Sequence, residues 1–182
     1  LMVALLSKCC GAARAQLQVL RHLDAATGYG TYTGPIVVGG FLYGCAFQGG
    51  PTNHGVVYRM ALDGSGYTVL HFFGGPEGAE PYGKLLSVGE TLYGTTVSGG
   101  VSNQGVVFRV RRDGTGFKVL HQFTGAEGTN PYGRLEIGFA DGYNYLFGTT
   151  ARGGLHGGGT IFRVRTNGTL FSVLHQFGLG TD

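Results

Sequence analysis

Apolar and polar residues alternate along this chain in short runs that are typical of β-strands. One stretch shows the pattern most clearly and predicts four strands, at residues 82–88, 91–97, 106–111 and 117–123. The third is almost continuously apolar, which indicates a strand buried on both faces. In the fourth, every second residue is apolar or aromatic, so we expect one face to carry Phe117, Val119, His121 and Phe123.

Glycine-rich turns separate these predicted strands. Asp113-Gly114-Thr115-Gly116 lies between the third and the fourth, where glycine can adopt the positive φ of a hairpin turn. The matching residues elsewhere are Asp63-Gly64 and Asn167-Gly168, so turn chemistry accounts for this Asn without glycosylation. Gly99-Gly100 opens a longer loop between the second and third strands. We therefore expect hairpins in sequence order.

The same pattern occurs three times. Leu42-Tyr43-Gly44 returns as Leu92-Tyr93-Gly94 and as Leu146-Phe147-Gly148, at steps of 50 and 54 residues. Four hairpin-linked strands in a unit of this length describe a β-propeller blade. We predict an all-β fold, a propeller-like array of four-stranded blades, with repeat units at about residues 34–73, 81–123 and 131–177.

The segment at Leu17–Leu23 matches only the last strand of a repeat, the one around Val69-Leu70-His71. It would be a fourth strand without a blade of its own. Three complete blades are too few for a closed ring, because propellers have about four to eight. The sequence therefore predicts three blades plus this orphan strand, as a fragment of a larger propeller.

The composition supports a folded chain with many strands. Of 182 residues, 37 are glycine and 22 are phenylalanine or tyrosine, and 13% are charged. A hydrophobic share of 42% is too high for a disordered glycine-rich tract.

Residues 1–15 differ from the repeats. The apolar run Leu1–Leu6 precedes Ala13-Arg14-Ala15, which fits the small-x-small rule for signal-peptide cleavage. The chain starts without Met and without a positively charged segment, so we interpret residues 1–15 as a truncated secretory signal peptide. The run is too short to span a membrane. We expect residues 16–182 to be secreted, extracellular or displayed on the cell surface.

Cysteine and charge narrow the function classes further. Without residues 1–15 the chain keeps one cysteine, Cys45, and has no disulfide framework. Cys45 stands where the other repeats have Thr95 and Thr149, so we interpret it as a small core residue. The same cleavage leaves 11 basic against 10 acidic residues, spread over the repeats. A nucleic-acid-binding protein usually has a clustered basic stripe, so nucleic acid is excluded as a partner.

One motif connects the chain with a known family. The second repeat reads L-Y-G-T-T-x-x-G-G-x-x-x-x-G-V-V-F-R-V, then D-G-T-G-F-x-V-L-H-x-F-x-G, and it resembles the GloVer tandem repeat over about residues 17–177. The resemblance implies an exported bacterial protein, in many members with a C-terminal anchor, which here would lie in a missing part. It implies no activity and no catalytic residues. The Gly-Gly pair also resembles kelch repeats, although the kelch tryptophan is absent.

Histidine recurs at one position in every repeat, which suggests a metal site at first sight. Zinc ligands must converge on one point at about 2.0–2.1 Å, whereas equivalent outer strands of neighbouring blades diverge. We therefore predict that these histidines hydrogen-bond within each blade beside Phe73, Phe123 and Phe177. The positions are His71, His121 and His175.

Arginine recurs in the third strand of every repeat, at Arg59, Arg109 and Arg163. A catalytic residue is needed once, so repetition favours a packing role. We expect each guanidinium to lie between blades, on backbone carbonyls or a carboxylate.

Other signs of chemistry are weak. The acidic segment Glu77-Gly78-Ala79-Glu80 supplies too few of the 6–8 oxygen ligands that calcium takes. Gly157-Gly158-Gly159 lies between strands and does not open a helix, so it does not predict a phosphate site. We find no nucleophile elbow and no paired carboxylates, and we expect no catalytic residue, no metal and no cofactor.

Loop side chains that differ between repeats are the best candidates for recognition, because binding residues often lie on loops of a rigid scaffold. The predicted ligand-binding residues are Asn53, His54, Asn103, Gln104, Arg152 and His156. The leading hypothesis is a non-enzymatic binding or display module for a glycan or protein surface. Two alternatives are a propeller hydrolase or lyase acting on extracellular polysaccharide, and a purely structural envelope repeat.

Overall fold

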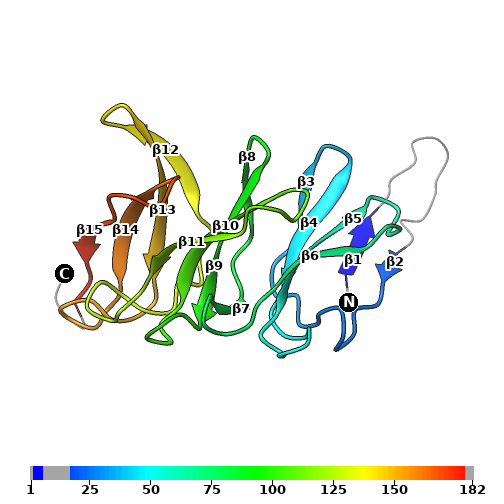
Figure 1. Cartoon of the computed structure of the whole chain (residues 1–182), viewed down its shortest axis with the longest axis horizontal. Helices are drawn as coiled ribbons and strands as arrows, with labels where there is room; N and C mark the ends of the chain where they lie inside the picture. Colours follow the sequence, from blue (N-terminus) through cyan, green and yellow to red (C-terminus); the bar gives the residue numbers. More distant parts are fainter. Residues whose placement is uncertain (1, 6–16, 179–182) are drawn as a thin grey trace.

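Three antiparallel sheets, of four, five and four strands, follow one another along the chain and stand side by side along its longest axis (Figure 1). The computed structural model describes residues 2–5 and 17–178. All regular secondary structure among these residues is β-strand. The predicted all-β, propeller-like array of blades is therefore confirmed. The first sheet consists of β3 (Ile36–Val38), β4 (Phe41–Ala46), β5 (Val56–Ala61) and β6 (Thr68–Phe72).

The other two repeats have the same four-stranded order, β8 to β11 and β12 to β15. Repeat 2 consists of β8 (Leu86–Val88), β9 (Thr91–Ser98), β10 (Val106–Arg111) and β11 (Lys118–Gln122). Repeat 3 consists of β12 (Glu136–Ala140), β13 (Tyr143–Thr150), β14 (Thr160–Arg165) and β15 (Ser172–Gln176). As predicted, β10 is almost completely buried, since Val106, Val107, Phe108 and Val110 all have 0% exposure.

The first strand of repeat 2 is shorter than the expected residues 82–88. It begins at Leu86, and a separate strand β7 (Ala79–Pro81) pairs with the far end of β9. The backbone at residue 83 lies close to the next repeat instead, because a Cβ on Gly83 would be 2.7 Å from the Gly133 carbonyl oxygen. Close backbone contact between repeats therefore replaces strand pairing at this point.

A β-bulge corrects the predicted alternation of the fourth strand. Val107 pairs with His121 and Phe108 with Val119, so Leu120 is an extra residue on β11. One inserted residue reverses the faces of the strand beyond it. Val119 packs toward repeat 1, whereas Leu120 and Phe123 pack toward repeat 3. The four side chains expected on one face thus lie on two, and the same shift recurs in β5–β6 and β14–β15.

The hydrophobic core lies between the sheets. One cluster joins repeats 1 and 2 and includes Tyr43, Phe73 and Phe108, and a second joins repeats 2 and 3 and includes Phe123 and Phe162. Each repeat therefore buries its apolar face against the next one, which is how stacked repeats gain stability.

The N-terminal strand β2 (Leu17–Arg21) pairs with β1 (Met2–Leu5) and packs on repeat 1. A Cβ on Gly64 would be 2.4 Å from the Leu20 carbonyl oxygen, and Gly114 and Gly168 approach Leu70 and Leu120 in the same way. β2 therefore takes the place of a preceding fourth strand. Apart from β1, the predicted signal peptide lies outside the described residues.

Candidate functional site

A recurring backbone frame holds the loops between the second and third strands. Gly50 donates its N–H to Ala25 O, Gly100 to Gly75 O and Gly154 to Gly125 O, at 2.9–3.0 Å. The residue before the donor must also be glycine in repeat 2, because Gly99 has φ +76° and a Cβ on it would lie 2.5 Å from the Ala79 nitrogen. Each loop is therefore tied to the segment that precedes its own repeat.

Two of the predicted binding residues help to build this frame. Asn53 and Asn103 adopt positive φ, 58° and 54°, and their Oδ1 atoms accept bonds from Gly49 N and Gly99 N at 3.0 and 2.8 Å. The equivalent position in repeat 3 is Gly157, with φ 79°. Asparagine and glycine at one repeat position are a sequence signal for left-handed backbone.

Replacement of Asn103 tests this structural role. Asn103→Ala should lower the free energy of unfolding by about 1–3 kcal/mol, because it loses the bond to Gly99 N and strains the left-handed backbone. Asn103→Gly loses only the hydrogen bond from Gly99 N, so it should lower the free energy of unfolding by less. Urea unfolding of both variants checks the order. Equal stability of Asn103→Ala and the parent chain would contradict it.

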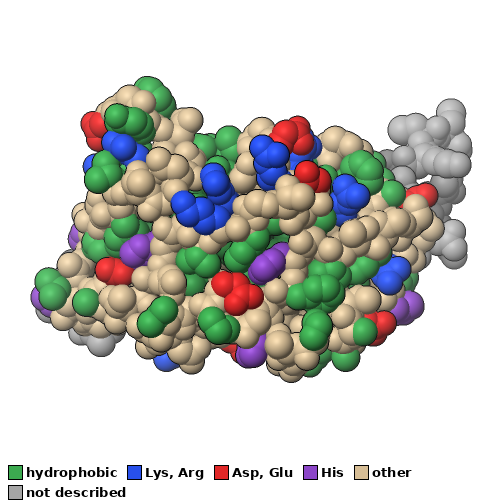
Figure 2. Space-filling model, in the orientation of Figure 1, with side chains coloured by type: hydrophobic (Ala, Val, Ile, Leu, Met, Phe, Trp, Pro, Cys, Tyr) green, Lys and Arg blue, Asp and Glu red, His purple; other side chains and the backbone are tan. Residues whose placement is uncertain are grey.

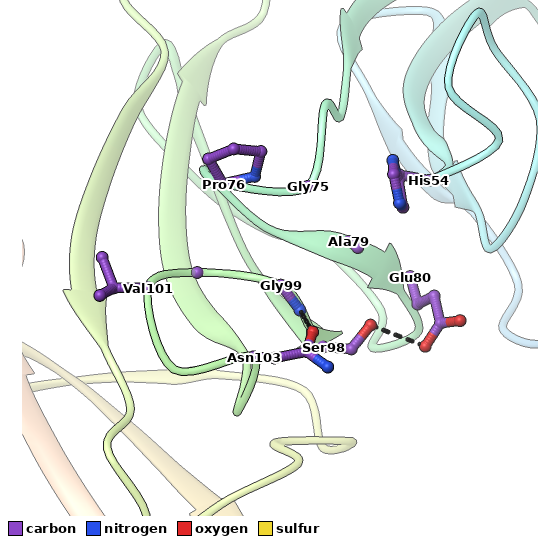
Figure 3. Close-up of a pocket in the computed structure, with 10 residues that line it drawn as sticks. His54, Gly75, Pro76, Ala79, Glu80, Ser98, Gly99, Val101 and Asn103 are labelled. Carbon is purple, nitrogen blue, oxygen red and sulfur yellow. Dashed lines mark hydrogen bonds between the residues drawn. The ribbon is translucent and has the colours of Figure 1, made fainter.

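A pocket of about 520 Å³ opens between repeats 1 and 2 on the loop side (Figure 3). His54 and Asn103, both predicted for binding, line it together with Glu80 and Ser98. The Ser98 hydroxyl donates to Glu80 Oε2 at 2.8 Å, and the Nδ1 atom of His54 is buried without a hydrogen-bond partner among the described residues. Glycine backbone of Gly75, Gly99 and Gly100 forms much of the remaining wall.

The other predicted binding residues do not reach this pocket. Gln104 is half-buried, and the exposed Arg152 and His156 belong to the loop of repeat 3. Two residues of the pocket were missed as binding candidates, namely Glu80 and Ser98. Sequence variation could have identified them, because the equivalent positions between repeats 2 and 3 hold Asn130 and Arg152.

The recurring histidines join neighbouring repeats. His71 stacks on Phe117 with ring centroids 3.5 Å apart, and His121 stacks on Phe171 at 3.6 Å. Between β2 and repeat 1, Arg21 takes the place of the histidine and lies 4.4 Å above the Tyr67 ring. Edge-on contacts within the repeat, to Phe73 and Phe123, complete the packing. His175 contacts Phe177 edge-on at 4.6 Å.

Each of the first two histidines faces a glutamate. His121 Nε2 lies 2.9 Å from Glu127 Oε1, and His71 Nε2 lies 3.8 Å from Glu77 Oε1. Burial lowers the pKa of both imidazoles, more than the nearby carboxylates raise it. Both histidines are therefore neutral in the folded chain near pH 7.

Acid should weaken the fold through these residues. A depressed folded-state pKa means that the stability from neutral histidine is fully present above the unfolded value of about 6.5 and is lost as pH falls through the folded value. The free energy of unfolding should decrease between about pH 7 and 5, and His71→Gln/His121→Gln should flatten this decrease. Exposed His156→Gln is the control and should leave the slope unchanged. Urea titrations at each pH measure it, and an unchanged slope in the double variant would refute the assignment.

The recurring arginines each face an aromatic residue across the strand pair. Arg59 lies opposite Tyr43, Arg109 opposite Tyr93 and Arg163 opposite Phe147. Arg59 also lies 5.5 Å from the Phe41 ring, and Arg163 Nη1 lies 3.4 Å from Asp141 Oδ2. Figure 2 shows basic side chains gathered in the upper part of the molecule and histidines lower down.

The remaining sequence candidates give no sign of metal or redox chemistry. Among residues 2–5 and 17–178, no group of three or more His, Cys, Asp or Glu could hold a metal ion. The same residues include no helix that could cross a membrane. Cys45 is buried, and burial raises the pKa of its thiol to about 12, which makes it unreactive near pH 7.

Comparisons with known proteins agree with this fold. A family model described as the Gloeobacter/Verrucomicrobia repeat matches residues 10–182, so the chain belongs to that family. No curated protein matches the chain. A chain of the nidogen/laminin complex is similar with TM-score 0.54 and 18% identity, over 77% of this chain and 46% of that one. The tricorn protease is similar with TM-score 0.50 and 12% identity, over 81% and 13%. The chain thus spans less than half of either structure, and these likenesses show the fold alone.

Proposed function

We propose that this member of the Gloeobacter/Verrucomicrobia repeat family is a non-enzymatic recognition module of a secreted or cell-surface protein. Its pocket between repeats 1 and 2 binds a polar group of an extracellular glycan. The observation that carries the proposal is the combination of a constant glycine frame with different side chains at each junction. His54, Glu80 and Ser98 stand where the next junction has Gln104, Asn130 and Arg152.

The chemistry of the pocket suits a ligand rich in hydroxyl groups. Its volume of about 520 Å³ lies within the usual range of small-molecule sites, about 300–1,000 Å³. Ser98 holds one oxygen of the Glu80 carboxylate, which orients the other oxygen as an acceptor. The imidazole of His54 and the amide of Asn103 add further polar groups to the wall. Sugar hydroxyls can donate to and accept from such groups at the same time.

The lining favours binding over hydrolysis. Glycoside hydrolases generally use a pair of carboxylates on either side of the scissile bond. Glu80 is the single carboxylate among the described residues that line this pocket. The polysaccharide hydrolase therefore receives no support from the geometry, whereas a binding site needs only the oriented polar groups.

A glycan array probed with the chain tests the proposal. The parent should bind a defined set of glycans, and His54→Ala/Glu80→Gln should weaken that binding about tenfold or more, because it removes polar groups within the pocket. His156→Ala is the matched control, a histidine exposed on another loop, and should bind like the parent. Unchanged binding by the pocket variant, binding to proteins alone, or release of reducing sugar ends would overturn the proposal.

A further inference from the structure

A row of tyrosines crosses the three repeats at the segments that lead into the first strands. Tyr32, Tyr82 and Tyr132 occupy equivalent positions, at steps of 50 residues. The Tyr32 and Tyr82 rings are stacked with centroids 4.9 Å apart, and Tyr132 meets Tyr82 edge-on at 5.3 Å. Phe47 supports the row edge-on, 5.2 Å from Tyr32. We call Tyr32, Tyr82 and Tyr132 the tyrosine row.

The tyrosine row is held in place by backbone contacts yet remains open to solvent. Thr33 donates its hydroxyl to Tyr82 O at 3.2 Å, and Thr95 donates to Gly133 O at 3.4 Å. Tyr32 and Tyr132 are nevertheless 61% and 45% exposed. Large aromatic side chains in contact with one another and with water are typical of binding surfaces.

Basic residues accompany the row at the same repeat spacing. Lys84 and Arg134 follow Tyr82 and Tyr132 two residues later on the same segments, and both are exposed. Among the described residues Lys84 forms no ion pair, and Arg134 has a solvent-exposed pair with Glu136 at 3.4 Å. Exposed ion pairs contribute little to stability, so the charges of Lys84 and Arg134 are both available to a carboxylate of a ligand.

We propose that the tyrosine row, with Lys84 and Arg134, binds an extended acidic polysaccharide built from uronic acids. Exposed aromatic rings recognise the C–H faces of sugar rings, and Tyr32 and Tyr132, the exposed members, stand at the two ends of the row. The two basic residues recognise the carboxylates that such a chain carries at regular intervals. None of these residues lines the pocket that contains His54, so the proposal does not depend on the function assigned to that pocket.

A short oligogalacturonate is the probe, with a neutral cello-oligosaccharide of equal length beside it. The chain has no tryptophan, so tyrosine emission reports binding directly. The parent should bind the acidic sugar more tightly than the neutral one, and added salt should weaken binding. Tyr32→Ala/Tyr132→Ala should weaken it about tenfold or more, as aromatic anchors of an interface do. Lys84→Gln/Arg134→Gln should weaken it and reduce the dependence on salt.

Control variants separate this surface from folding and from the pocket. Tyr132→Phe keeps the ring and should bind like the parent, as should Phe139→Ala, which removes an aromatic side chain that is 74% exposed elsewhere. His54→Ala/Glu80→Gln should also bind the acidic sugar normally. Loss of binding in the pocket variant would assign the sugar to the pocket and overturn this proposal. It would also be overturned by equal affinity for the neutral sugar, by no binding to either sugar, or by full binding in the double tyrosine variant.

Discussion

Gly105→Ala is expected to lower the free energy of unfolding by more than any other substitution proposed for this chain. Gly105 directly precedes β10 with φ +92°, and a Cβ there would lie 2.3 Å from Thr96 O and 2.8 Å from Pro131 Cδ. The first of these atoms belongs to the backbone, so neither side can move without breaking the β9–β10 ladder. We expect a loss of about 4 kcal/mol or more, at the upper end of single-residue effects.

The matched control is Gly89→Ala. Gly89 also has positive φ, +56°, but no atom of the described residues lies within 4 Å of the Cβ that the substitution would add. This variant should lower the free energy of unfolding by about 1 kcal/mol, because the left-handed backbone conformation is its only source of strain. Circular dichroism and urea unfolding of both variants measure the difference. A Gly105→Ala chain as stable as Gly89→Ala would show that the close backbone contact does not exist in solution.

Phe123→Ala is expected to have the second largest effect, a loss of about 3–5 kcal/mol. Phe123 is 1% exposed and packs edge-on against Phe162 at 5.1 Å and Phe171 at 5.9 Å. Removing its ring would leave a cavity between repeats 2 and 3, where the surrounding rings cannot close in completely. The two repeats would then lose a large part of their shared core.

Phe177 occupies the equivalent position in repeat 3 and provides an unusually close control. It is the same residue type at the same place in the motif, but it is 38% exposed in this chain. Phe177→Ala should cost about 1 kcal/mol, since less apolar surface returns to water. Thermal and urea unfolding measure both. A similar loss for the two variants would mean that the outer face of repeat 3 is covered in solution.

Much of the fold follows from local patterns. Turn residues such as Asp113-Gly114 adopt the hairpin geometry that their chemistry favours, with φ 90° at Gly114. The apolar run of Val106–Val110 predicted a buried strand, and the repeat spacing predicted the blades. These features depend on neighbours in the chain or on a motif that recurs, so they can be predicted from the sequence.

The candidate site was less predictable, since it assembles residues from different repeats. His54 and Glu80 line one pocket although two whole strands, β5 and β6, lie between them in the chain. Loop variability identified His54 and Asn103 as candidates, but not that Asn103 also supports the loop, and it did not select Glu80. Which variable positions meet depends on how one repeat is placed against the next, and side-chain types alone do not encode that placement.

The sequence by itself determined the strand order, the hairpin turns, the number of repeats and the aromatic positions that recur. Tertiary structure decided the direction in which those aromatic residues point. The bulge at Leu120 reverses the faces of β11, so that Val119 packs on repeat 1 and Phe123 on repeat 3. A bulge is a property of the pairing between two strands, so the order of apolar and polar residues along one strand does not reveal it. The pairing of β10 with β11 therefore decided which face each aromatic residue takes.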